Sequence, residues 1–305
     1  MFSMRYSGYL WALYCRFMCS GGAANNLKVL HFFEDIGIPI CEGYGLTETS
    51  PVLAASTPSD AGQWSQRRLG CTGVVLPNVT LKVLDPATMN EVGPDQEGEV
   101  CATGPSVMNG YRKNQAANDE VFHMHTDGKK YFRTGDLGTL VEGKFLKITG
   151  RIKEQFKLEN GKYVVPAPLE DFVSRSRYVA QTFLYGDNKA YNVVFIVPEI
   201  AEVRGWADKN KLDYADDNAL MRLDEVRGLL SKEILENSAA MKGYERPKKW
   251  DYTLELFSQE NYLLTPKMSI RRNNVMKLYG DSILACYDKG GVNMRSDIGD
   301  GKMNL

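Results

Sequence analysis

The chain has 305 residues, of which 43% are hydrophobic and 25% charged, and its net charge is -1. A chain of this length can bury a hydrophobic core in one or two domains, and these fractions are those of a soluble globular protein. A net charge near zero excludes a general attraction to nucleic acid or anionic membranes. The six cysteines lack the paired spacing of a zinc site, so we expect buried free thiols in a reducing, cytoplasmic compartment.

The chain opens with a short apolar segment at residues 9–15, which Arg16 interrupts. It is too short to span a bilayer, which takes about 20 apolar residues. It also lacks the charged leader and small-residue cleavage site of a signal peptide. A core helix and a peripheral contact with an intracellular membrane both stay open, and the core helix is favoured.

The first half of the chain changes from helical to strand-like patterns. Residues 27–36 have apolar side chains at helical spacing, and Gly37 predicts the end of that helix. Residues 39–41 predict a short strand. From residue 70 to residue 149, short apolar runs alternate with turn residues, which predicts a β-rich subdomain with strands at 80–84 and 99–103 and a hairpin at 139–148.

The second half predicts a mixed α+β domain. Helices are expected at residues 169–175 and along the apolar stripe from Leu220 to Ile234, and strands at 182–186, 192–198 and 250–257. The run at 192–198 is almost wholly apolar, as in a strand buried on both faces. We place the domain boundary at 150–153, which gives domains at 1–150 and 151–287, and expect a disordered tail at 288–305.

Residues 41–51 are the most informative segment. They include two glycines, a tyrosine, two threonines and the carboxylate of Glu48. Glycine lets a backbone turn sharply or lie close to a ligand, and carboxylate oxygen suits magnesium, a hard cation. An ordinary glycine-rich turn is the alternative for this segment taken alone.

Five further segments accompany it in a fixed order, at residues 20–23, 69–77, 98–105, 131–138 and 150–157. Together the six resemble the motifs of the adenylate-forming (AMP-binding) family, which includes acyl-CoA synthetases, luciferases and peptide-synthetase adenylation domains. The resemblance runs from about Phe17 to about Leu278. Residues 45–52 and 156–164 are similar to long-chain fatty acyl-CoA synthetases in particular.

This resemblance implies an α/β fold: the C-terminal part of the family's large domain, with its β-rich subdomain, followed by a small mobile α+β domain. It implies a ligase that joins a long-chain fatty acid to CoA through an acyl-adenylate, with ATP, Mg²⁺ and CoA bound and with no nucleic-acid partner. A non-catalytic remnant that binds AMP or acyl-AMP is the alternative function.

The resemblance also implies roles for single residues. Glu48 is the magnesium ligand and Thr47 a donor to the α-phosphate, with a loop carboxylate and a turn-capping threonine as the alternatives. Asp136 accepts from the ribose hydroxyls, which suits an acceptor-only carboxylate, and Arg151 faces the ribose and phosphates. The residues implied to surround the adenine are Gly22, Ala23, Gly43, Tyr44 and Gly45, with Tyr44 stacking on the base or, alternatively, buried in the core.

Two lysines carry the remaining implied roles. Lys153 matches the hinge about which the small domain swings. A catalytic lysine is implied three residues before an arginine near the C-terminus, where counting back from Arg272 reaches Ser269 instead. Lys267, two residues earlier, reaches the same face if the segment is extended; a solvated Lys267 is an equal alternative.

The family's phosphate loop, rich in Ser, Thr and Gly and ending in Lys, has no match in this sequence. The resemblance therefore covers only the C-terminal half of a synthetase. A truncated gene model, a separate N-terminal half and a degenerate paralogue remain open.

Overall fold

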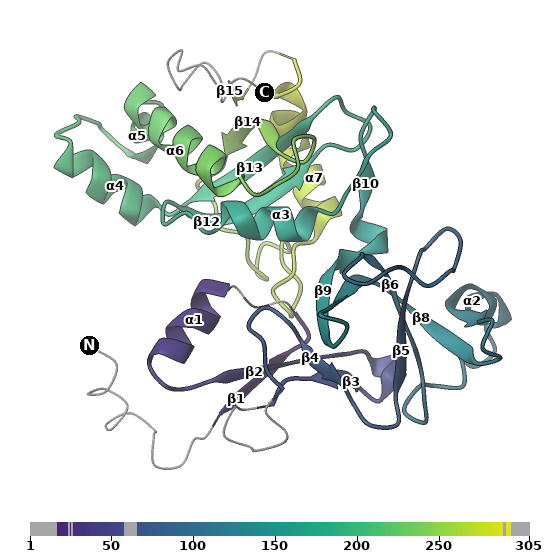
Figure 1. Ribbon diagram of the computed structural model, residues 1–305. Helices are drawn as coiled ribbons and strands as arrows, with labels where there is room; N and C mark the ends of the chain where they lie inside the picture. Colours follow the sequence, from purple (N-terminus) through teal and green to yellow (C-terminus); the bar gives the residue numbers. More distant parts are fainter. Residues whose placement is uncertain (1–16, 24, 26, 58–65, 289–290, 294–305) are drawn as a thin grey trace. The chain divides into compact units, whose positions relative to one another are not determined.

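The computed structural model describes residues 17–23, 25, 27–57, 66–288 and 291–293. It divides into two compact units, Met1–Lys153 and Glu154–Leu305. The sequence placed this division between residues 150 and 153. Figure 1 shows both units, and each is described by itself below.

The first unit is built on one large sheet. Its path is β1-β2-β3-β4-β9-β8-β6-β5, with β7 added against β8. Strands β1 and β2 pair in parallel, whereas the other pairs are antiparallel. The strands are β1 Met18–Gly21, β2 Ile40–Gly45, β3 Val52–Ala55, β4 Gly73–Val75, β5 Thr80–Leu84, β6 Gly98–Thr103, β7 Phe122–Met124, β8 Lys130–Val141 and β9 Phe145–Arg151.

Helical segments in this unit are short: α1 Leu27–Asp35, the 3₁₀ turn η1 Thr47–Thr49, α2 Gln115–Val121 and the 3₁₀ turn η3 Ile152–Glu154. The expected helix at 27–36 is confirmed as α1, and Gly37 follows it at φ 80°. The expected hairpin is also confirmed, because β8 and β9 join through Glu142 and Gly143, both at positive φ. Helix α2 was not predicted; it buries none of its residues.

The second unit is a four-stranded sheet covered by helices on both faces. Its strands β12 Val179–Tyr185, β13 Asn192–Pro198, β14 Pro247–Tyr252 and β15 Val292–Asn293 lie in that order. A separate pair, β10 Phe156–Lys157 and β11 Tyr163–Val164, precedes them. The helices are α3 Pro166–Val173, α4 Ile200–Lys209, α5 Asp217–Leu220, α6 Asp224–Asn237 and α7 Arg272–Ala285.

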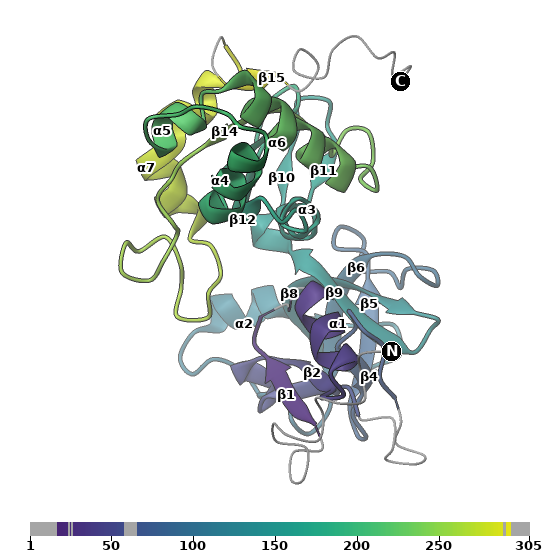
Figure 2. The ribbon, with the colours of Figure 1, turned by 90° about the vertical axis from the view of Figure 1, so that its left-hand side faces the viewer.

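Strand β13 is buried on both faces, in line with the helices that cover both sides of this sheet. All seven of its residues are buried, as its apolar run predicted. Val194 and Ile196 face the cluster formed by α3, α4 and α6, whereas Val193, Phe195 and Val197 face the cluster that includes α7. Figures 1 and 2 show α3, α4 and α6 together on one face of this sheet and α7 on the other.

Several expectations for this unit were wrong. The apolar stripe from Leu220 to Ile234 is two helices, α5 and α6, because Leu223 adopts an extended conformation at φ -64° and ψ 134° between them. The expected strand at 250–257 ends at Tyr252. Helix α3 begins at Pro166 itself, since proline lacks only an N–H that the first helical turn leaves unbonded. Helices α4 and α7 were not predicted.

The expected disordered tail is also wrong in part, because Val292 pairs with Trp250 of β14. Residues 289–290 and 294–305 lie outside the described residues, as does the apolar segment at 9–15. Four of the described cysteines are buried as expected, but Cys19 is exposed. No helix within the described ranges has the length and apolar character needed to cross a membrane.

Candidate functional site

The end of β2 and the turn to β3 carry the glycine-rich segment, and its two glycines, both in β2, differ. A Cβ atom added to Gly45 would lie 1.8 Å from the carbonyl oxygen of Pro51, so only glycine fits there. A Cβ added to Gly43 would meet nothing closer than 3.8 Å. Gly45 therefore shapes the turn, whereas the Gly43 position has room for a larger side chain.

A threonine caps this turn, but it is Thr49 and not Thr47. The Thr49 hydroxyl accepts from the Leu46 N–H at 3.0 Å and contacts the carbonyl of Pro51. Thr49 is fully buried, whereas Thr47 is exposed on η1. Thr49, two residues after Thr47, therefore fills the turn-cap role that was the alternative for Thr47. Thr47 itself lies at the surface of the glycine-rich turn.

Asp136 is the centre of a buried polar group. It is 5% exposed, and its carboxylate accepts a 2.9 Å hydrogen bond from the Tyr44 hydroxyl. Arg151 lies directly opposite Asp136 in the β8–β9 ladder, and its Nε lies 3.2 Å from Oδ1. Burial, and then the charge of Asp136, raise the pKa of Tyr44, so its hydroxyl stays protonated and donates.

The contact between Tyr44 and Asp136 requires a strongly curved sheet. Strand β2 is four steps from β8 along the sheet. Since neighbouring strands lie about 4.8 Å apart, a flat sheet would separate the two by about 19 Å, farther than a tyrosine reaches. Curvature brings residues 92 positions apart in the chain into a hydrogen bond.

The ring of Tyr44 packs in the core. It is 9% exposed and belongs to an apolar cluster with Leu53, Val100 and Leu146. The ring therefore lies among apolar side chains, as in the alternative of a core tyrosine, and its stacking on adenine stays a prediction. The hydroxyl of Tyr44 instead orients Asp136.

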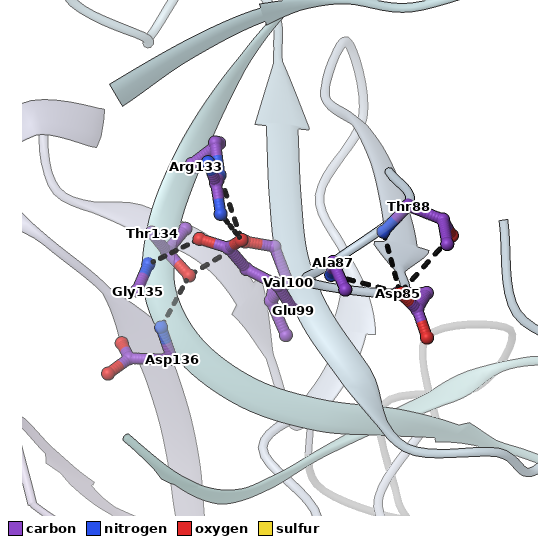
Figure 3. Close-up of polar contacts among 9 residues, drawn as sticks. All are labelled: Asp85, Ala87, Thr88, Glu99, Val100, Arg133, Thr134, Gly135 and Asp136. Atoms are coloured by element: carbon purple, nitrogen blue, oxygen red, sulfur yellow. Dashed lines mark hydrogen bonds and ion pairs between the residues drawn. The ribbon is translucent and has the colours of Figure 1, made fainter. Parts of the chain in front are cut away.

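A second buried carboxylate, Glu99 of β6, supports the strand that carries Asp136. Glu99 is 2% exposed and accepts two bonds from Arg133, at 2.9 and 2.7 Å, and one from the Gly135 N–H at 3.2 Å. The Thr134 hydroxyl accepts from the Asp136 N–H at 3.1 Å and donates to the Val100 carbonyl at 2.7 Å. Figure 3 shows these bonds converging on the bend of β8 just before Asp136.

The sequence did not single out Glu99 as a supporting residue, since its partners lie more than thirty positions away.

Asp85, also drawn in Figure 3, accepts from Ala87 and Thr88 and closes a local turn. Those hydrogen bonds lower the pKa of Asp85. This turn directly follows the end of β5 and is a local structural feature.

Glu48 lies on η1, where its side chain is half-buried. Its Oε1 accepts from the Tyr111 hydroxyl at 2.9 Å, and its main-chain oxygen accepts from the Met108 N–H at 2.8 Å. Among the described residues, no three His, Cys, Asp or Glu side chains converge as a metal cage. A single carboxylate fits Mg²⁺ that is held mainly by phosphate and water, the usual arrangement in nucleotide enzymes.

Gly22 and Ala23 follow the end of β1 and are exposed. Gly22 has φ 85° and open space where a Cβ would be. Beside them, Ser20 donates to Asn25 at 2.9 Å, and Asn25 donates to Glu42 at 3.0 Å. Burial raises the pKa of Glu42. This network fixes the exposed Gly22 backbone next to β2.

Lys153 lies within η3 and is the last residue of the first unit. Lys267 lies in the second unit, and its segment is not extended as the sequence argument required. Residues 265–268 form a turn closed by a 2.8 Å bond from the Met268 N–H to Thr265, and Leu264 bridges Ile270. Both Lys267 and Ser269 are exposed on this turn.

The first unit combines a curved sheet, a buried carboxylate and a glycine-rich turn, and a separate α+β unit follows it. Residues 10–112 match the family model of AMP-binding enzymes, and residues 153–291 match that of the AMP-binding enzyme C-terminal domain. The chain belongs to the AMP-binding, adenylate-forming enzyme family.

Curated relatives agree with this family. The chain is 33% identical over 279 residues to long chain acyl-CoA synthetase 7, peroxisomal, of Arabidopsis thaliana, covering 89% of this chain and 38% of that protein. It is 32% identical over 275 residues to human long-chain-fatty-acid–CoA ligase 1, with the same two coverages. The chain thus spans under half the length of these relatives.

Solved structures show the same fold. The adenylation domain of a carboxylate reductase from Mycobacterium chelonae aligns with a TM-score of 0.66 at 24% identity, over 88% of this chain and 38% of that one. O-succinylbenzoate coenzyme A synthetase of Bacillus subtilis, in complex with ATP and magnesium, aligns with a TM-score of 0.60 at 22% identity, over 85% and 46%.

Proposed function

We propose that this chain binds the AMP part of an acyl-adenylate and supplies the C-terminal part of a long-chain fatty acid–CoA ligase. The observation that carries the proposal is the buried Asp136, held by Tyr44 and Arg151. A carboxylate accepts hydrogen bonds only, so Asp136 suits the two ribose hydroxyls, which donate. The names of the curated relatives support the long-chain fatty acid and CoA as substrates.

The remaining roles follow from position. Arg151 is 61% exposed on its side chain, so its guanidinium is accessible to a phosphate. Thr47 and Glu48 stand on the same 3₁₀ turn, and bound Mg²⁺ would neutralise phosphate charge there. The exposed Gly22 and Ala23 backbone, with the Gly43 position, would line the base. Lys153 is the proposed hinge.

The proposal predicts that Asp136→Asn weakens AMP binding by about 10- to 150-fold. An amide presents an N–H₂ donor to ribose donors, and a hydrogen bond to a charged group contributes about 1.5–3 kcal/mol. The measurement is calorimetric titration of the 305-residue chain with AMP. The matched ligand is 2′,3′-dideoxy-AMP, which lacks both hydroxyls and should bind the parent and the variant alike. Equal losses for both ligands would place Asp136 away from the ribose.

One observation favours a second function, binding of AMP or acyl-AMP without adenylation. Ser269 occupies the position that the resemblance gives to a lysine, and Lys267 lies in a turn rather than on an extended face. Under this reading, pyrophosphate exchange with ATP and palmitate is absent in the parent and unchanged in Lys267→Ala. Loss of a measurable exchange rate in Lys267→Ala would instead assign the catalytic role to Lys267.

A further inference from the structure

Tyr111 contacts the carboxylate on which the proposed metal site depends. Its hydroxyl donates to Glu48 Oε1 at 2.9 Å, from a segment 63 positions away in the chain. The Met108 N–H also bonds the main-chain oxygen of Glu48 at 2.8 Å. The segment around residues 108–111 therefore holds both the backbone and the side chain of Glu48.

Tyr111 is itself held at its backbone by one side chain of α2. Asn118 Oδ1 accepts from the Tyr111 N–H at 2.6 Å, and Asn118 Nδ2 donates to the Tyr111 carbonyl at 3.0 Å. Gly110 has φ 149°, and a Cβ there would lie 2.8 Å from Asn118 Oδ1. Asn114 caps α2 through the Ala117 N–H at 3.1 Å. Because α2 buries none of its residues, packing into the core does not explain its position.

We propose that Tyr111 is a positioning residue for Glu48, and that α2 fixes Tyr111 through Asn118. The inference rests on the proposed function, in which Glu48 binds the metal. A hydrogen bond to Oε1 restricts rotation of the carboxylate, and Oε2 would then face a bound cation. Partners that orient a metal-binding carboxylate typically contribute about 10- to 100-fold in metal affinity.

A competing role for Tyr111 predicts a change of metal affinity in the opposite direction. If the phenol only occupied Glu48 until a cation displaced it, then removing the hydroxyl would free the carboxylate and tighten metal binding. If Tyr111 only stabilised the fold, removing its hydroxyl would lower the melting temperature and leave the metal affinity of the remaining folded protein unchanged. The sign of the change in metal affinity therefore separates these three roles.

The experiment titrates Mn²⁺ into the 305-residue chain saturated with AMP and measures free Mn²⁺ by electron paramagnetic resonance. Tyr111→Phe is expected to bind Mn²⁺ about 10-fold more weakly than the parent, with unchanged metal-free AMP affinity and melting temperature. The matched control is Tyr214→Phe, which removes an equivalent 2.9 Å bond to Asp208 in the other unit and should leave Mn²⁺ affinity as in the parent. Asn118→Ala should weaken Mn²⁺ binding in the same direction as Tyr111→Phe.

Equal or tighter Mn²⁺ binding by Tyr111→Phe overturns the inference. The variant Glu48→Gln distinguishes failure of the inference about Tyr111 from failure of the proposed function. If AMP binds the parent but Glu48→Gln leaves Mn²⁺ affinity unchanged, the metal role of Glu48 and the inference both fail while nucleotide binding stands. If AMP does not bind the parent, the proposed function fails, and the inference, which rests on it, fails with it.

Discussion

Replacing Arg272 with alanine is expected to destabilise the second unit by about 3–5 kcal/mol, the usual effect of removing one partner of a buried ion pair. Arg272 starts α7, and its guanidinium donates to Glu170 Oε1 at 2.9 Å and to the Leu184 carbonyl. It also lies over the Phe183 ring, 4.5 Å from the centroid. Glu170 is 8% exposed, so Arg272→Ala leaves a buried carboxylate without its cation.

Urea unfolding of the parent and variants, followed by circular dichroism, measures this effect. Arg204→Ala is the matched control, because Arg204 makes a two-point contact with Asp217 at the surface, where solvent screens the charges. It should change the unfolding midpoint little. Glu170→Gln introduced together with Arg272→Ala should recover part of the loss, since a neutral amide is cheaper to bury than an unpaired charge. Equal midpoints for the two arginine variants would contradict the prediction.

Gly45→Ala is expected to disrupt the first unit, whereas Gly43→Ala, two residues earlier in β2, should leave it folded. A Cβ at Gly45 would overlap the Pro51 carbonyl at 1.8 Å, and backbone atoms cannot rotate aside. Forcing extra atoms into a packed site typically costs about 1–3 kcal/mol, and more where backbone must move. At Gly43 the nearest atom would lie 3.8 Å away, an ordinary contact.

Differential scanning calorimetry of both variants tests this pair, with AMP titration of whichever remains folded. Gly45→Ala should lower the transition of the first unit or abolish it. Gly43→Ala should keep the transition, and any loss of AMP affinity would then arise from steric contact with the ligand. If Gly45→Ala were as stable as the parent, the turn would have to move away from the added Cβ, and the prediction would be wrong.

The sequence by itself determined the features that depend on neighbouring residues. Helix α1 follows from apolar spacing and its terminal glycine, and the β8–β9 hairpin follows from Glu142 and Gly143. Strand β13 follows from an unbroken apolar run, because a strand covered on both faces needs apolar side chains on both. The family was also readable from sequence, since six motifs in order are far more specific than any one.

Local pattern failed where distant parts of the chain decide the conformation. The apolar stripe at 220–234 has helical spacing, yet it breaks at the extended Leu223, just after Leu220 and Met221, which are fully buried in the core. Strand β14 gains its partner β15 from a stretch whose composition indicated disorder. In both cases tertiary contacts contribute more free energy than local propensity.

The long-range polar contacts were decided by tertiary structure alone. Tyr44 meets Asp136 across 92 positions, Tyr111 meets Glu48 across 63, and Arg272 meets Glu170 across 102. The sequence identified four of these six residues as motif positions, but only the curved sheet and the packed helices determine which atoms face each other. A hydrogen bond depends on a separation of about 3 Å and a direction, and chain folding sets both over distances that no local pattern records.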